Sequence, residues 1–154
     1  MAQTNEPLLS VKGLKQYFPV SKKFTVRAVD NISFDIYPGE TYGLVGESGS
    51  GKSTTGRSII RLYDPTEGTI LFNGEDISKK LTAKQEKMLR SDMQMVFQDP
   101  MASLNERAKV DYIVSEGLIN FHLYKDETDR KRKVEHALRE VGLLPEFASR
   151  FPHE

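Results

Sequence analysis

One glycine-rich segment restricts the fold of this chain more than any other feature. Residues 46–53 have the sequence Gly-Glu-Ser-Gly-Ser-Gly-Lys-Ser, which matches the Walker A phosphate-binding pattern. A short apolar run, Thr41 to Val45, precedes the loop, and a proline-free stretch from Lys52 to Leu62 follows it. We therefore expect a buried strand, a loop and a helix in succession, which is the context that this pattern requires.

The residue types in this loop suit a polyphosphate. Glycine lacks a Cβ and tolerates positive φ, so Gly46, Gly49 and Gly51 let the backbone curl and direct its N–H groups at phosphate oxygens. The N-terminus of the following helix adds partial positive charge, and Lys52 adds a full charge for the β- and γ-phosphates. The alternative is a glycine-rich turn that binds nothing.

Hydroxyl groups after the lysine extend the predicted site. Ser53 offers a hard oxygen ligand for Mg²⁺, and Thr54 offers a hydroxyl for the α-phosphate. The sequence therefore predicts binding of a nucleoside triphosphate, ATP with Mg²⁺. The expected binding residues are Gly46, Glu47, Ser48, Gly49, Ser50, Gly51, Lys52, Ser53 and Thr54.

Hydrophobic periodicity divides the rest of the chain. Short, partly alternating apolar runs predict strands, whereas the spacing of apolar residues beyond about residue 104 is helical. Strands are expected at residues 8–14, 25–36, 68–72 and 93–97, with a tight turn at Asn73-Gly74. Helices are expected at 83–90 with Thr82 as N-cap, and over 110–121 and 134–141, the last ended by Gly142.

Composition excludes several classes of function. The chain has no cysteine, which rules out disulfides, thiolate metal sites and cysteine nucleophiles. The 22 basic and 22 acidic residues cancel, so net charge favours neither nucleic acid nor an anionic membrane. No apolar run reaches the ~18 residues of a membrane span. We interpret the basic run Arg130 to Lys133 as a solvated helix face and assign no catalytic role to His122, His136 or His153.

Further segments make the chain resemble the ATP-binding subunits of ABC transporters. Gln98 follows the run 93–97 where that family keeps its Q-loop glutamine, and residues 97–100 followed by Ser103-Leu104-Asn105 are similar to the subgroup that imports dipeptides and oligopeptides. Residues 141–144 and 150–154 resemble the approach to the family's signature sequence. Glu106 departs from the pattern, because a proline is expected there.

This resemblance implies an α/β fold of the P-loop NTPase class. It would have a RecA-like core with an N-terminal antiparallel β subdomain and the start of an α-helical subdomain, and it would be incomplete. Residues 1–98 would form the nucleotide-binding β/α part. Residues 99–154 would form the Q-loop and a partial helical subdomain that ends before the signature motif.

The resemblance also implies roles for single residues. Lys52 and Gln98 would take part in catalysis, with Gln98 also a Mg²⁺ ligand beside Ser53. An aromatic ring would stack on adenine; Phe18 is the first choice and Tyr17 the alternative, with core packing as the structural interpretation of either. The coupling surface for the membrane subunits would include Met101, Leu104 and Tyr112.

The resemblance further implies partners and a location. The partners would be transmembrane permease subunits and a second ATP-binding subunit, at the inner face of the cell membrane. The Walker B Asp-Glu, the signature and the switch histidine do not occur in residues 1–154. We therefore expect a truncated chain that binds ATP without efficient turnover. The alternatives are a nucleotide-sensing module or another P-loop NTPase, such as a small kinase or a GTPase.

Overall fold

The computed structural model describes residues 6–99 and 101–154, so Pro100 of the predicted Q-loop segment lies outside the described residues. The chain divides into two compact units, one extending to Met95 and the other covering Val96–Glu154. Each unit is described by itself.

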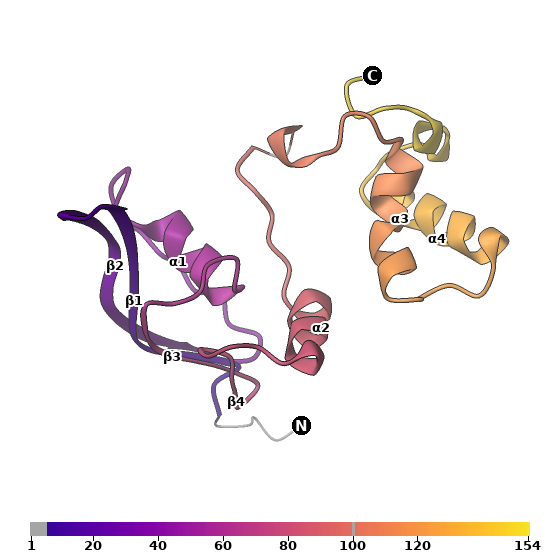
Figure 1. Ribbon diagram of the computed structural model, residues 1–154. Helices are drawn as coiled ribbons and strands as arrows, with labels where there is room; N and C mark the ends of the chain where they lie inside the picture. Colours follow the sequence, from indigo (N-terminus) through magenta and orange to yellow (C-terminus); the bar gives the residue numbers. More distant parts are fainter. Residues whose placement is uncertain (1–5, 100) are drawn as a thin grey trace. The chain divides into compact units, whose positions relative to one another are not determined.

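The first unit is built on a four-stranded antiparallel sheet of order β2-β1-β3-β4 (Figure 1). Strands β1 (Leu9–Ser21) and β2 (Phe24–Ile36) form a long hairpin, and β3 (Glu67–Phe72) pairs with the first half of β1. The short β4 (Glu75–Asp76) follows a turn in which Asn73 and Gly74 both have positive φ, as predicted for that dipeptide.

Two helices belong to this unit. Helix α1 (Lys52–Ile59) follows the glycine-rich loop and is shorter than the predicted range to Leu62. Helix α2 (Ala83–Asp92) has Thr82 as its N-cap. The Thr82 hydroxyl accepts from the Gln85 backbone N–H, and the Gln85 side-chain oxygen accepts from the Thr82 backbone N–H. This capping box confirms the predicted start of the helix. The hydrophobic core gathers Leu9, Val11, Leu14, Val29, Ile70, Phe72, Ile77 and Leu89.

Two of the predicted strands do not form. Residues 41–45 and 93–97 have no strand or helix assignment, and the exposed fraction is 93% for both Val45 and Val96. A strand requires a neighbour that accepts and donates its backbone hydrogen bonds. Among the described residues neither run has such a neighbour, so the apolar sequence alone leaves both segments irregular.

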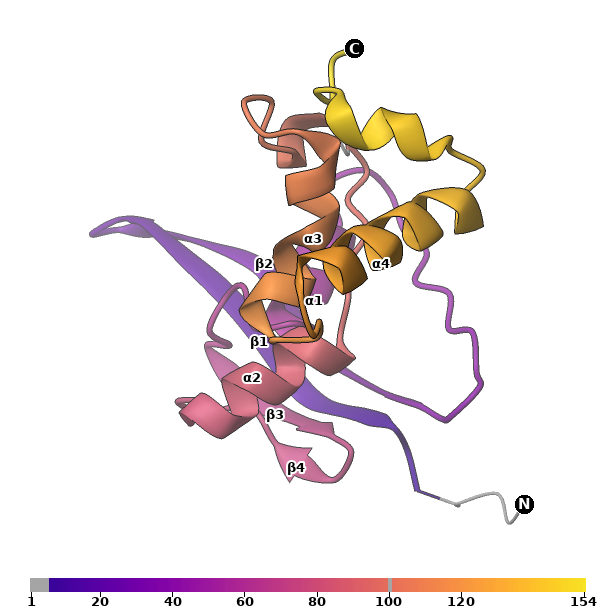
Figure 2. The same cartoon turned by 90° about the vertical axis from the view of Figure 1, so that its right-hand side faces the viewer.

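The second unit is helical. It contains a 3₁₀ turn (Met101–Ser103), α3 (Val110–Asn120), α4 (Glu127–Glu140) and a final 3₁₀ turn (Pro145–Ser149); α3 and α4 cross each other in Figure 2. Asp126 caps α4 by accepting from the Asp129 backbone, and Gly142 adopts φ 76° after its last turn. The predicted helical spacing in both segments is therefore confirmed.

The interpretation of the basic run 130–133 as a solvated helix face is wrong for Arg130. Arg130 is only 8% exposed, and its guanidinium contacts Asp111 of α3 at 2.9 Å and Glu127 at 2.7 Å. These two carboxylates raise the pKa of Arg130 further above its usual value. Arg130 is therefore an internal ion-pair residue that joins α3 to α4, whereas Arg132 remains exposed as expected.

Candidate phosphate-binding site

Gly51, the last residue before helix α1, packs against the middle of strand β2. Gly49 and Gly51 have φ of 79° and 90°, values that L-residues with side chains rarely adopt. A Cβ at Gly51 would overlap the carbonyl oxygen of Ala28 and would lie 3.5 Å from Cγ2 of Val29. Gly51 is thus required twice, for its backbone angle and for its close approach to the hairpin.

Lys52 turns its ammonium group back into the loop. Its Nζ donates to the carbonyl oxygens of Gly46 at 2.8 Å and Glu47 at 2.7 Å, and it lies 3.4 Å from the Ser50 hydroxyl. The charge is therefore held inside the curl of the backbone. Carbonyl oxygens are weaker partners for an ammonium than phosphate oxygens, so an incoming polyphosphate would compete well for this group.

The start of α1 is open to an anion. Gly51 at the N-cap position provides no side-chain cap, and the first turn contains no acidic residue. The first intrahelical hydrogen bond runs from the Thr55 N–H to Gly51 O, at 2.8 Å. The N–H groups of Lys52, Ser53 and Thr54 come before it in the chain and therefore have no acceptor within the helix. Free N–H groups and the helix dipole together favour a bound negative charge here.

Ser53 is exposed on the first turn of this helix. Within residues 6–99 and 101–154, no three His, Cys, Asp or Glu side chains gather closely enough to bind a metal ion. The exposed Ser53 hydroxyl is a hard oxygen donor next to Lys52, and it would fit a Mg²⁺ ion whose other ligands are phosphate and water oxygens.

The two candidate aromatic residues lie on opposite faces of β1, because consecutive strand residues alternate. Tyr17 donates its hydroxyl to Asp30 at 2.5 Å, which raises the pKa of the phenol, and the Arg27 guanidinium lies 5.5 Å from its ring centre. Phe18 instead makes an edge-on contact of 5.2 Å with Tyr63, in the segment just after α1. Phe18 is therefore the candidate on the face that carries α1.

Gln98 is exposed and belongs to the unit Val96–Glu154. The glycine-rich loop belongs to the other unit, which extends to Met95. Its role rests on the sequence.

Sequence reasoning missed a buried polar contact beside the loop. The Ser58 hydroxyl of α1 donates to Oε1 of Gln16 at 3.2 Å, and the exposed fractions of these residues are 0% and 4%. No sequence signal identifies this pair, because the two residues lie 42 positions apart and neither belongs to a motif.

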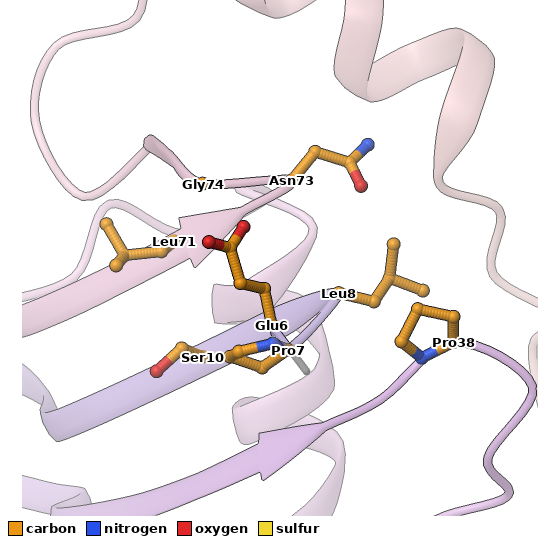
Figure 3. Close-up of a pocket in the computed structure, with 8 residues that line it drawn as sticks. All are labelled: Glu6, Pro7, Leu8, Ser10, Pro38, Leu71, Asn73 and Gly74. Atoms are coloured by element: carbon orange, nitrogen blue, oxygen red, sulfur yellow. The ribbon is translucent and has the colours of Figure 1, made fainter. Parts of the chain in front are cut away.

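Two cavities formed by described residues of the first unit bear on the position of the site. One, of about 450 Å³, borders the loop side of α1. It is lined by Phe34, Ile36, Tyr42, Leu44, Lys52, Ser53, Thr55, Gly56 and Ile59. The other, of about 430 Å³, lies where β1 begins, close to the Asn73-Gly74 turn (Figure 3). Glu6 is the one ionisable side chain among its lining residues, which does not suit a phosphate.

Comparison with known proteins supports the interpretation of the loop. The sequence profile of the family described as ABC transporter matches residues 29–154, which is most of the chain. The chain belongs to this family. The matched region includes the whole glycine-rich loop, α1 and Gln98, but it begins after Tyr17 and Phe18.

Individual relatives agree with this assignment. The chain is 54% identical to the oligopeptide transport ATP-binding proteins OppF of Bacillus subtilis and AmiF of Streptococcus pneumoniae, over 97% of its length and 48% of theirs. It therefore spans about half the length of the curated relatives it matches. Among solved structures, it resembles the ATP-binding cassette MJ0796 bound to ADP and Pi, with a TM-score of 0.79 and 25% identity, over 94% of this chain and 62% of that one.

A second solved structure is cbiO1 of Clostridium perfringens, part of the transporter complex cbiONQ. Its TM-score is 0.71 and its identity 28%, over 97% of this chain and 55% of that chain. The expected fold class is thus confirmed as that of an ABC cassette, of which the chain is a part. Among the residues that the structure describes, no helix is long and apolar enough to cross a bilayer.

Proposed function

We propose that this chain is the N-terminal part of the ATP-binding subunit of a peptide-importing ABC transporter and that it binds MgATP through residues 46–54. The observation that supports this proposal most directly is the position of Lys52. Its ammonium group donates to the carbonyl oxygens of Gly46 and Glu47, next to the start of α1, which has no side-chain cap. This arrangement provides one full positive charge and several N–H donors in one small volume. A triphosphate is the common ligand that uses all of them.

The proposal assigns a chemical task to each part of the site. Backbone N–H groups from Gly46 to Ser53 would donate to phosphate oxygens, and Lys52 would neutralise charge on the β- and γ-phosphates. Ser53 would be a ligand for Mg²⁺, and the Thr54 hydroxyl would donate to the α-phosphate. Phe18 stacks on adenine, because it shares the face of β1 on which α1 packs, whereas Tyr17 is engaged by Asp30 on the other face.

Gln98 completes the proposal from the sequence. Its side-chain amide combines a carbonyl ligand for Mg²⁺ with an N–H donor for the γ-phosphate or the attacking water. It begins the segment 99–154, which we propose as the Q-loop and partial helical subdomain. Met101, Leu104 and Tyr112 in this segment are the proposed contact with membrane subunits; Met101 and Tyr112 are exposed.

The proposed role in transport depends on the named relatives of the chain and not on the geometry of the phosphate site. OppF and AmiF are named as oligopeptide transport ATP-binding proteins. We extend this to the present chain: its partners would be permease subunits and a second ATP-binding subunit, at the cytoplasmic face of the membrane. ATP binding would drive the conformational change that peptide import requires.

The test is calorimetric titration of MgATP into the chain and into Lys52→Ala. Loss of a charge-assisted contact of about 1.5–3 kcal/mol predicts a Kd that rises by about tenfold or more. Lys84→Ala, an exposed lysine on α2, is the matched control and should leave Kd unchanged. Equal affinity of Lys52→Ala and the parent chain would refute the assignment of the loop. ATP turnover measured on the same samples separates an ATPase from a nucleotide-sensing module.

A further inference from the structure

A buried polar contact links β1 to the helix that follows the loop. Ser58 Oγ lies 3.2 Å from Gln16 Oε1 and 2.9 Å from the Thr54 carbonyl, and one hydroxyl proton serves both acceptors. Burying a side-chain amide and a hydroxyl costs free energy unless they bond to each other or to a neighbour. An apolar pair at these positions would pack without that cost, so the contact is not explained by core formation alone.

Each partner lies near a residue that is proposed to bind the nucleotide: Gln16 near the adenine-stacking ring, and Ser58 near the residue proposed for the α-phosphate. Gln16 precedes Phe18 by two residues; its side chain contacts α1, and the Phe18 ring contacts Tyr63 in the segment just after α1. Ser58 follows Thr54 by one helical turn and bonds to its carbonyl. A single path of covalent and hydrogen bonds therefore joins the base-side ring to the residue proposed for the α-phosphate.

The packing of α1 gives this path a fixed geometry. At the N-terminal end of the helix, Gly51 lies so close to β2 that an added Cβ would overlap the Ala28 carbonyl oxygen. Near the C-terminal end, Ser58 contacts Gln16 of β1, which pairs with Val29 in the hairpin. This close approach and this hydrogen bond lie about two turns apart, so together they oppose rotation or sliding of the helix over the hairpin.

We propose that Gln16 and Ser58 are positioning residues that set the distance between the adenine-stacking ring and the phosphate loop. The pair thereby determines how much the base adds to the affinity for the phosphates. This inference rests on the proposed function. It predicts an effect on the base and none on the phosphates.

The experiment compares two ligands, MgATP and magnesium tripolyphosphate, by calorimetry. In the parent chain, stacking on one ring should favour MgATP by about 5- to 150-fold. Gln16→Met and Ser58→Ala should each reduce that preference by about threefold or more, while the Kd for tripolyphosphate changes by less than about twofold. The double variant should lose no more than either single variant, because both remove the same contact.

Ser115→Ala is the matched control. Ser115 is also fully buried and donates its hydroxyl to a carbonyl of its own helix, Tyr112 O at 3.1 Å, but it belongs to the other unit. It should leave the ligand preference unchanged. Circular dichroism melting identifies variants that do not fold; should Gln16→Met be one, the smaller change Ser58→Ala decides the question.

Three results would overturn the inference. An unchanged preference in folded Ser58→Ala shows that the pair does not position the ring, and equal losses for both ligands show a merely structural role. In either case the parent chain still binds MgATP, so the proposed function survives. A parent chain that binds neither ligand refutes the proposed function and this inference with it.

Discussion

Replacing Gly51 by alanine tests whether the phosphate loop depends on its close contact with strand β2. An alanine at φ 90° costs about 1–2 kcal/mol, because its Cβ approaches the following carbonyl. The same Cβ would also overlap the Ala28 carbonyl, a backbone atom within the β1–β2 hairpin, and relieving such overlap costs about 1–3 kcal/mol. Alanine also lowers the conformational entropy of the unfolded chain, which stabilises the folded state by about 0.4–1 kcal/mol and offsets part of this cost.

Gly51→Ala should therefore destabilise the unit up to Met95 by about 2–4 kcal/mol. Gly39→Ala is the matched control, because Gly39 also has a positive φ of 78° but no atom lies within 4 Å of its added Cβ. That variant should cost only about 1 kcal/mol, which is the backbone part alone.

Urea unfolding followed through the NMR amide signals of β1 measures this unit separately from the helical one. Equal destabilisation by Gly51→Ala and Gly39→Ala would refute the close packing of the loop on the hairpin. Gly51→Ala should also weaken MgATP binding, and Gly39→Ala should not.

Three further outcomes follow from the structure. Phe18→Ala should weaken MgATP by about 5- to 150-fold and Tyr17→Ala by much less, measured by calorimetry; equal losses would contradict the assignment of the ring. Asp129 has a pKa held below its usual value, first by Arg132 and then by the Lys125 amide, so its stabilising effect on α4 is present above about pH 4 and disappears as the pH falls further. The helix content of the parent chain should therefore fall in an acid titration. The helix content of Asp129→Asn should be lower than that of the parent at pH 7, and the two should become equal in acid. A constant difference between the two curves over the whole pH range would exclude this role of Asp129. Thr82→Ala should cost about 1 kcal/mol through loss of the cap, detected as faster hydrogen exchange at the start of α2, and unchanged exchange would disprove the capping box.

Local sequence signals predicted local structure well. The Asn73-Gly74 turn, the Thr82 cap and the Gly142 helix end each depend on residues within one turn of the chain, and each is present. The residues of the glycine-rich loop are contiguous in sequence, so their assignment to the candidate phosphate site needs no distant partner; their role in binding stays a prediction.

Features that depend on distant partners were not predictable. Residues 41–45 and 93–97 have strand-like sequences, but a strand forms only beside another strand, and neither run is paired. Arg130 belongs to a run of basic residues, yet its burial depends on Asp111, which comes from a different helix. The Gln16–Ser58 contact likewise required the three-dimensional arrangement, since neither residue type signals a partner in sequence.

The most direct test of the phosphate site is an NMR titration of the chain with MgATP, following every backbone amide. The account predicts the largest shift changes at the amides of Gly46 to Ser53, with smaller changes around Phe18. Shift changes confined to the cavity near Glu6 and Asn73, or none at saturating MgATP, would contradict it.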